Sequence, residues 1–220
     1  MNLRHRSDAA EVTHDQDMEV RLWHLRIPMV FLAVTIGCAP GEEDFDTSAE
    51  NPTIIIQSTL GQIQVEIDEI QAPVTAANFL RYVDQGFYDG GSFFRTVHAG
   101  NQPQDSIRIA VVQAGARSDT TASFFEPILL ERTSKTGLKH LDGTISMARG
   151  GPDSATHSFF FCIDDQPELD FGGKRNPDGQ GFAAFGQVIS GGDVLRAIQM
   201  SPHEVQQLQP PIEILSIRRK

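Results

Sequence analysis

The stretch that decides the fold is GTISMARGGPDSATHSFFFCI, residues 143–163. Thr144–Ala148 is short and partly apolar, and Ser158–Ile163 is rich in aromatic and β-branched residues, which predicts two strands. Residues 150–153, Gly-Gly-Pro-Asp, are typical of a turn. The pattern therefore predicts two neighbouring strands joined by a wide loop.

The second of these strands has two different faces. Because adjacent side chains of a strand point to opposite sides, Phe160 is predicted to face away from Phe159 and Phe161. One face must fill a core, and the other must line something else. A run of phenylalanines alone is more typical of a sheet that is buried on both faces.

Several short motifs follow one another along the chain: Asn78-Phe79, Ser146-Met147-Ala148, Gly151-Pro152, Phe159-Phe160 and Phe185-Gly186. In this order they resemble the cyclophilins, the peptidyl-prolyl cis-trans isomerases, from about Thr53 to the C-terminus. The resemblance implies a mainly β fold, in which a closed barrel of eight antiparallel strands is capped by two α-helices. It also implies proline-containing polypeptides as substrates.

The resemblance implies a site as well. Arg95 takes the position of the family's main catalytic residue, Phe160 that of the pocket phenylalanine and Gln113 that of the pocket glutamine. The other residues expected to bind substrate are Ala110, Val111, Ala148, Arg149, Leu169 and Phe182. Without the family order, Arg95 would be interpreted as an exposed arginine at a strand end.

The chain departs from the family pattern at several of these positions. Ala110 and Val111 stand where the family usually has phenylalanine and methionine. Glu168 and Phe182 replace a common tryptophan and histidine, and Arg149 replaces a common asparagine, which is tolerable if the peptide is held through the backbone. These departures keep open the alternative of a proline-peptide-binding or chaperone module with weak or lost isomerase activity.

A hydrolase is a third class to consider. Ser154 or Ser158 with His157 and Asp153 would supply the residue types of a catalytic triad. Residues adjacent in sequence rarely form one, and no nucleophile elbow is present, so this function is disfavoured. His140 is interpreted as a hydrogen-bonded core residue.

The amino-acid composition excludes some classes of binding partner. The 220 residues, 40% hydrophobic, suit one globular domain plus additional segments. A net charge of −11 argues against nucleic acid, because binding a phosphate backbone requires a basic patch. Cys162 is predicted to be a buried, inert thiol, and no Cys/His spacing indicates a zinc site. We expect a monomer without cofactor or metal.

The N-terminal segment is interpreted as a targeting signal, and Met18 is a candidate for the true start. Two arginines precede an apolar run, Ile27–Ile36, which has the length of a signal-peptide core. It is shorter than the roughly 20 residues that a transmembrane helix needs. The following Thr35-Ile36-Gly37-Cys38 resembles the lipobox of bacterial lipoproteins, although threonine replaces the usual leucine. Residues 1–37 are therefore predicted to be a signal peptide and Cys38 to be lipidated, ahead of an uncleaved anchor or an ordinary secretory signal.

Residues 38–52 are acidic and weakly apolar, which predicts a disordered tether. The domain at residues 53–220 would then lie in the cell envelope, outside the cytoplasm, and be held to a bacterial membrane by its lipid alone. The strands predicted in it, besides the two above, are Thr53–Ser58, Gln62–Ile67, Ser92–Val97, Ile107–Gly115, Phe182–Ile189 and Ile212–Ile217. The predicted helices are Pro73–Gln85, with an apolar face of Val74, Ala77, Phe79, Leu80 and Val83, and Asp193–Met200.

Overall fold

A computed structural model describes residues 51–117 and 125–220. The predicted signal peptide and the lipidated Cys38 lie outside these residues, as does nearly all of the predicted tether. Among the residues that are described, no helix is both long and apolar enough to cross a membrane.

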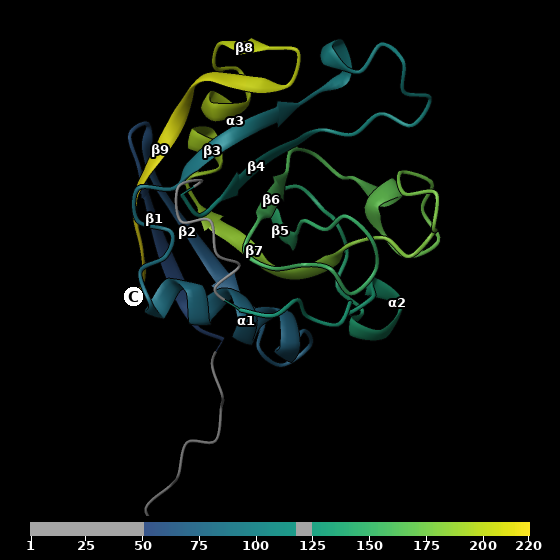
Figure 1. Cartoon of the computed structure of the whole chain (residues 1–220), viewed down its shortest axis with the longest axis horizontal. Helices are drawn as coiled ribbons and strands as arrows, with labels where there is room; N and C mark the ends of the chain where they lie inside the picture. The colour runs from purple at the N-terminus through teal and green to yellow at the C-terminus, as the bar shows by residue number, and fades with distance from the viewer. Residues whose placement is uncertain (1–50, 118–124) are drawn as a thin grey trace, which may run out of the picture. The chain divides into compact units, whose positions relative to one another are not determined.

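The strands form one antiparallel sheet that closes on itself (Figure 1). Around the sheet the order is β1-β2-β7-β5-β6-β4-β3-β9, and β9 pairs again with β1. These eight strands confirm the predicted closed barrel, and β8 is added as a short hairpin partner of β9. The bounds are β1 Thr53–Ser58, β2 Gly61–Ile67, β3 Ser92–Val97, β4 Val111–Gly115, β5 Thr144–Met147, β6 Phe159–Cys162, β7 Ala183–Ser190, β8 His203–Glu204 and β9 Gln207–Arg219.

Two helices cover the ends of the barrel. In the view of Figure 1, α1 (Pro73–Asp84) lies below it and α3 (Gly192–Gln199) lies above it. Pro73 occupies the first turn of α1, where its missing N–H costs no hydrogen bond. A third, single-turn helix, α2 (Thr133–Thr136), and two short 3-10 turns, η1 (Ala99–Asn101) and η2 (Pro167–Leu169), lie in the connections.

The buried face of α1 differs from the predicted one. Val74 and Ala77 are exposed, whereas Ala76 and Tyr82 are buried beside the correctly predicted Phe79. Tyr82 lies against further rings at the end of the barrel. Phe79, Leu80 and Val83 are buried as predicted, so the periodicity located the helix and three of the five residues expected on its buried face.

The main core fills the barrel. In β2, Ile63, Val65 and Ile67 point inward and are fully buried, which confirms the predicted alternation. Phe159 and Phe161 of β6 belong to the same core, and Phe159 meets Phe79 of α1 edge to face. Apolar burial of this kind contributes most of the free energy of folding.

Two predicted strands have clearly different bounds, whereas β2, β5, β6 and β7 differ from the prediction by one residue at one or both ends. The strand expected at Ile107–Gly115 begins only at Val111, because Gln102 takes the place of a strand partner for Ile109. The buried Gln102 amide donates to the Ile109 carbonyl over 2.6 Å and accepts from its N–H over 3.2 Å. At the other end of the chain, β9 begins five residues before the predicted Ile212, in spite of Pro210 and Pro211.

Candidate active site

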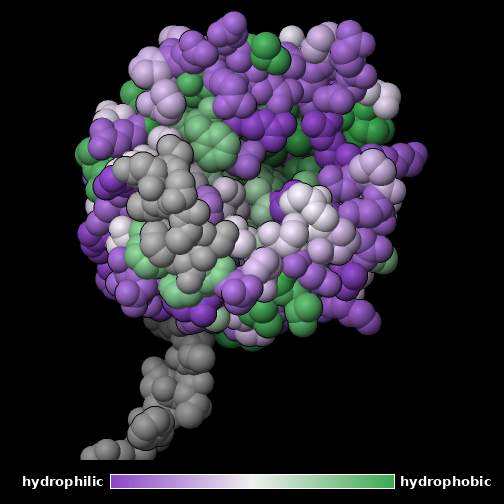
Figure 2. Space-filling model, viewed as in Figure 1, coloured by the Kyte–Doolittle hydropathy of each residue, from purple (hydrophilic) through white to green (hydrophobic). Residues whose placement is uncertain are grey.

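The outer face of β6 starts a second, smaller apolar cluster. Phe160 lies there, apart from its two neighbours in the main core, as the alternation predicts. It packs against Phe182 with the ring centroids 5.2 Å apart and the rings nearly perpendicular. On the face shown in Figure 2, hydrophilic side chains dominate the surface and apolar ones gather in a central hollow.

A cavity of about 110 Å³ opens on this cluster. Ordinary ligand pockets measure roughly 300–1,000 Å³, so this cavity suits one small ring rather than a large ligand. Its walls are formed by Arg95, Ile109, Val111, Gln113, Ala148, Arg149, Phe160, Leu169 and Phe182. The structure thus brings together, from six segments of the chain, eight of the nine residues predicted from the sequence.

Ala110 is the predicted residue that does not line the cavity. It packs against the main core, and its backbone is tied to the end of β6 through an Ile163 N–H and to the Gln166 side chain. Because side chains alternate along this extended segment, Ile109 and Val111 face the cavity and Ala110 faces the core. Sequence reasoning missed Ile109, although the same alternation around Val111 would have indicated it.

Arg95 is one of three polar residues of the cavity wall, with Gln113 and Arg149. Its Nη1 donates to Oε1 of Gln113 over 3.0 Å, and its Nε and Nη2 both donate to Oε1 of Gln206 over 2.9 and 2.6 Å. Burial lowers the pKa of Arg95, with a further contribution from the nearby Arg175. An arginine pKa lies so far above neutrality that the guanidinium still carries its charge.

Arg149 lines the cavity with its side chain, and not only with its backbone as the sequence led us to expect. The side chain is 1% exposed and forms a two-pronged ion pair with Asp178, over 2.7 and 2.9 Å. Its Nε donates to the Gly181 carbonyl, and its guanidinium lies 5.2 Å from the Phe182 ring. The hydrogen bond from Arg149 lowers the pKa of Asp178 to about 2. Arg149 therefore ties the loop before β7 to the cavity wall.

The backbone of that loop is also fixed close to the cavity. The Phe182 N–H donates to the Leu169 carbonyl over 2.9 Å, so the two residues lie side by side in the wall. Gly181 permits this approach, because its φ is +67° and a Cβ there would lie 2.5 Å from the Asp170 backbone.

His140 supports Phe160 from behind, as a core residue. Its ring stacks on Phe160 at an interplanar angle of 12°, and its two nitrogens lie 2.8 Å from Asp170 Oδ1 and 2.9 Å from Ser146 Oγ. This arrangement has the partners of a Ser-His-Asp triad, but His140 and Ser146 are buried and neither lines the cavity. A substrate has no access to the Ser146 hydroxyl, so the group is structural.

The hydrolase considered from the sequence is not assembled. Ser154 Oγ bonds only the backbone of Gly150 and Gly151, and Asp153 accepts from the Leu130 N–H. His157 Nδ1 accepts from the Ala116 N–H. These side chains shape loops and do not form a catalytic relay.

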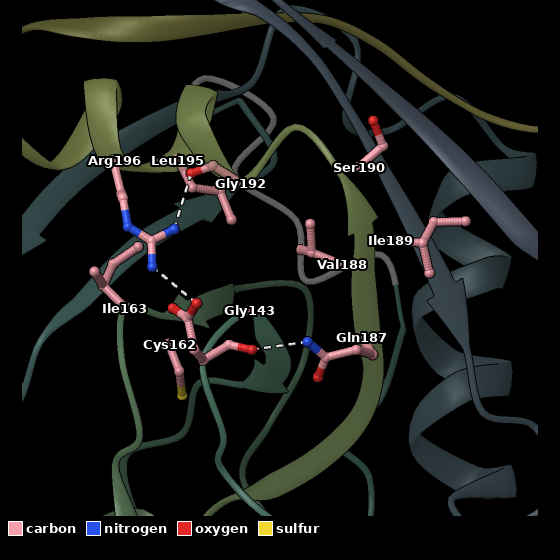
Figure 3. A pocket seen from close by; sticks show the side chains of 11 residues that line it. Gly143, Cys162, Ile163, Gln187, Val188, Ile189, Ser190, Gly192, Leu195 and Arg196 are labelled. Carbon is pink, nitrogen blue, oxygen red and sulfur yellow. Dashed lines mark hydrogen bonds and ion pairs between the residues drawn. The ribbon is translucent and has the colours of Figure 1, made fainter.

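A second cavity, of about 200 Å³, lies between β7, α3 and the turn before β5 (Figure 3). Arg196 reaches over it from α3 and donates to Asp142 Oδ2 over 2.8 Å, and Gln187 donates to the Asp142 carbonyl. Cys162 lies at its wall and is buried, as predicted, and this burial raises the pKa of its thiol well above the usual range. Asp142, Gln187 and Arg196 are thus bonded to one another and not directed at a ligand.

Comparisons with known proteins agree with this geometry. The sequence profile of the family described as "Cyclophilin type peptidyl-prolyl cis-trans isomerase/CLD" matches residues 53–219. A peptidyl-prolyl cis-trans isomerase of Acinetobacter baylyi is 33% identical over 176 residues, which cover 77% of this chain and 86% of the relative. Peptidyl-prolyl cis-trans isomerase B of Escherichia coli is 34% identical over 140 residues, 63% of this chain and 79% of the relative.

Among solved structures, a cyclophilin-type isomerase of Cryptosporidium parvum, crystallised in the presence of the dipeptide Ala-Pro, has the same fold. The TM-score is 0.62 at 20% identity, over 76% of this chain and 98% of the other. The profile match over most of the chain, the bacterial relatives and the barrel with its apolar cavity lead to one conclusion: this chain belongs to the cyclophilin family and is a peptidyl-prolyl cis-trans isomerase.

Proposed function

We propose that this isomerase accelerates prolyl bond rotation in extracytoplasmic proteins, with Arg95 as its catalytic residue. The observation that supports this role most is the position of the guanidinium at the wall of a small apolar cavity. Three of its N–H groups are held by glutamine side chains. A guanidinium has five N–H donors, so two remain for a substrate.

The chemistry requires no bond to a substrate atom. Rotation about a peptide bond has a barrier of about 18–20 kcal/mol, because the nitrogen lone pair is delocalised into the carbonyl. A donor aimed at the prolyl nitrogen withdraws that lone pair from resonance. A charged hydrogen bond contributes about 1.5–3 kcal/mol, which corresponds to roughly ten- to a hundredfold in rate.

The remaining residues of the cavity hold the substrate. Phe160, Leu169 and Val111 would enclose the proline ring and remove it from water. Gln113 would orient the flanking peptide. Arg149 would contribute its backbone to the peptide, as the resemblance implies, while its side chain holds the loop that carries Phe182.

A protease-coupled assay with a proline-containing peptide tests this function on the full chain. We expect isomerisation above the spontaneous rate. Binding of such peptides without acceleration would favour the alternative of a binding or chaperone module. Ala110 gives less support to that alternative than the sequence suggested, because Ile109 and not Ala110 forms the cavity wall.

We further propose that the domain is tethered to a bacterial membrane through lipid on Cys38. The support is the apolar run that ends in Gly37-Cys38. The intact mass of the membrane-extracted protein should correspond to residues 38–220 plus lipid. Retention of Ile36, or an unmodified Cys38, would contradict the proposal.

A further inference from the structure

We propose that Gln206, at the tip of the β8–β9 hairpin, is a positioning residue that holds Arg95 in its catalytic orientation. The inference rests on the role proposed above for Arg95. Gln206 lies 111 residues from Arg95 in the sequence, and it does not line the cavity. Its effect on the reaction therefore has to pass through Arg95.

The contact fixes the guanidinium from two sides. The single Oε1 of Gln206 accepts from both Nε and Nη2 of Arg95, while Gln113 accepts from Nη1 on the other side. The Gln206 amide nitrogen donates to the Asn101 carbonyl over 3.3 Å, which determines that the oxygen and not the nitrogen faces Arg95. The guanidinium plane is thereby fixed without the use of its last two donors.

The group that holds Arg95 is neutral, as is the Gln180 oxygen that binds Arg132, and this distinguishes Arg95 from five other arginines of the described chain. Arg149, Arg175, Arg196, Arg218 and Arg219 each form an ion pair with an aspartate. An aspartate on Arg95 would orient it equally well but would offset its charge. An amide oxygen orients the donor and leaves the positive charge for the prolyl nitrogen.

The hairpin tip is held in place although its backbone is unfavourable. Val205, directly before Gln206, has φ +55°, which is a conformational outlier for a β-branched residue. The Thr96 N–H donates to the Gln206 carbonyl over 2.9 Å, next to Arg95 in β3. Strained residues that persist because their surroundings fix them occur most often at functional sites.

A histidine pair ties the same hairpin to the turn after β3. His203 Nδ1 donates to the Ser201 carbonyl and His98 Nδ1 accepts from the Gly100 N–H. These partners leave His98 Nε2 as the donor and His203 Nε2 as the acceptor of the 3.2 Å contact between the rings. The hairpin and this turn together form the frame in which Gln206 reaches Arg95.

Three variants of the full chain test the inference: Gln206→Ala, Gln206→Glu and, as a matched control, Gln207→Ala. The exposed Gln207 is the next residue and is paired with Arg95 across the two strands, but among the described residues its side chain forms no hydrogen bond. For Gln206→Ala we expect kcat to fall about tenfold with KM nearly unchanged, since the lost contact acts on a group used in the transition state. The control should keep the wild-type kcat and KM.

Gln206→Glu separates positioning by a neutral group from simple structural support. The side chain keeps its shape, so the fold and the contact should persist, but the new charge offsets that of Arg95. We expect kcat to fall at least about threefold with an unchanged melting temperature. A wild-type or higher kcat would overturn the inference, even if Gln206→Ala failed to fold.

Arg95→Ala, measured beside these variants, separates the proposed catalytic role of Arg95 from the positioning role of Gln206. If it loses activity while both Gln206 variants keep the wild-type kcat, the positioning role is wrong and the proposed role of Arg95 stands. If Arg95→Ala itself keeps full activity, the proposed mechanism fails first.

Discussion

Arg95 and Arg196 each border one of the two cavities described above, and they differ in what holds them. Arg95 is half-buried and bound by amide oxygens, whereas Arg196 is 49% exposed and bound by the Asp142 carboxylate. Their pKa values move in opposite directions: burial lowers that of Arg95, and the hydrogen bond to Asp142 raises that of Arg196. A carboxylate offsets the positive charge of the arginine that it binds. An amide oxygen binds the guanidinium without offsetting this charge.

The comparison favours the smaller cavity for the proposed reaction. At about 200 Å³ the cavity at Arg196 has more room than the cavity at Phe160, but its guanidinium forms an ion pair with Asp142. The smaller cavity combines apolar walls with Arg95, whose guanidinium is bound by amide oxygens instead of a carboxylate. We therefore assign the proposed reaction to this cavity because of the state of its charged group, and not because of its volume.

The largest expected effect is at Arg95. Arg95→Ala should lower kcat/KM for a proline-containing peptide by at least about tenfold, because the charged hydrogen bond is lost. Arg95→Lys should recover little, since an ammonium lacks the planar fork that both glutamines bind. The coupled assay measures the rate, and circular dichroism checks the fold. Full activity of Arg95→Ala would remove the distinction between the two arginines.

A smaller effect is expected at Arg149, the third arginine at a cavity. Arg149→Ala should raise KM about threefold, because the loop and Phe182 lose a partly exposed ion pair and the cavity loses a wall. Asp178→Asn, which keeps a hydrogen bond to Arg149, should have less effect. A change confined to kcat would instead indicate direct participation of Arg149 in the reaction.

Acid should act on the two regions at different pH values. Burial lowers the folded-state pKa of His98 and of His157 below 6.5, so the unfolded chain binds more protons. Their contribution to stability is complete above about pH 6.5 and declines as the pH falls towards their folded-state pKa values.

The pKa of Asp142 is lowered as well, because hydrogen bonds from Arg196 and from the Asp164 backbone outweigh the opposing effect of burial. The Asp142–Arg196 pair should therefore persist until below about pH 4.

Urea unfolding at about pH 7.5, 5.5 and 3.5 measures this order. We expect a first decrease of the midpoint between the first two values and a second one at the lowest. His98→Asn should reduce the first decrease and leave the second unchanged. A midpoint that stays constant down to pH 5.5 would show that the histidines are not responsible.

The smallest effect is expected at Arg196. Its ion pair with Asp142 is about half exposed, so Arg196→Ala should lower the free energy of unfolding by about 0.5 kcal/mol or less. The value of kcat/KM should not change. A clear loss of activity would show that the cavity at Arg196 takes part in the reaction, and would contradict its assignment to the cavity at Arg95.

Features that depend on local pattern could be predicted from the sequence. The alternation of β2 and the outward face of Phe160 follow from the two-residue period of a strand, which needs no partner to be read. The barrel and eight of the nine cavity residues followed from short motifs in family order. The least accurate predictions concerned bounds, such as the start of β4 and the length of β9, where side-chain hydrogen bonds and distant pairing decide.

Only the tertiary structure decided how the site is held together. It placed Ile109 rather than Ala110 in the wall, turned the Arg149 side chain onto Asp178, and brought Gln206 to Arg95. Each of these depends on hydrogen bonds between segments far apart in the sequence, and no local periodicity encodes such a contact. The residues of the site could therefore be predicted from the sequence. The neutral side chains that bind Arg95 without offsetting its charge could not.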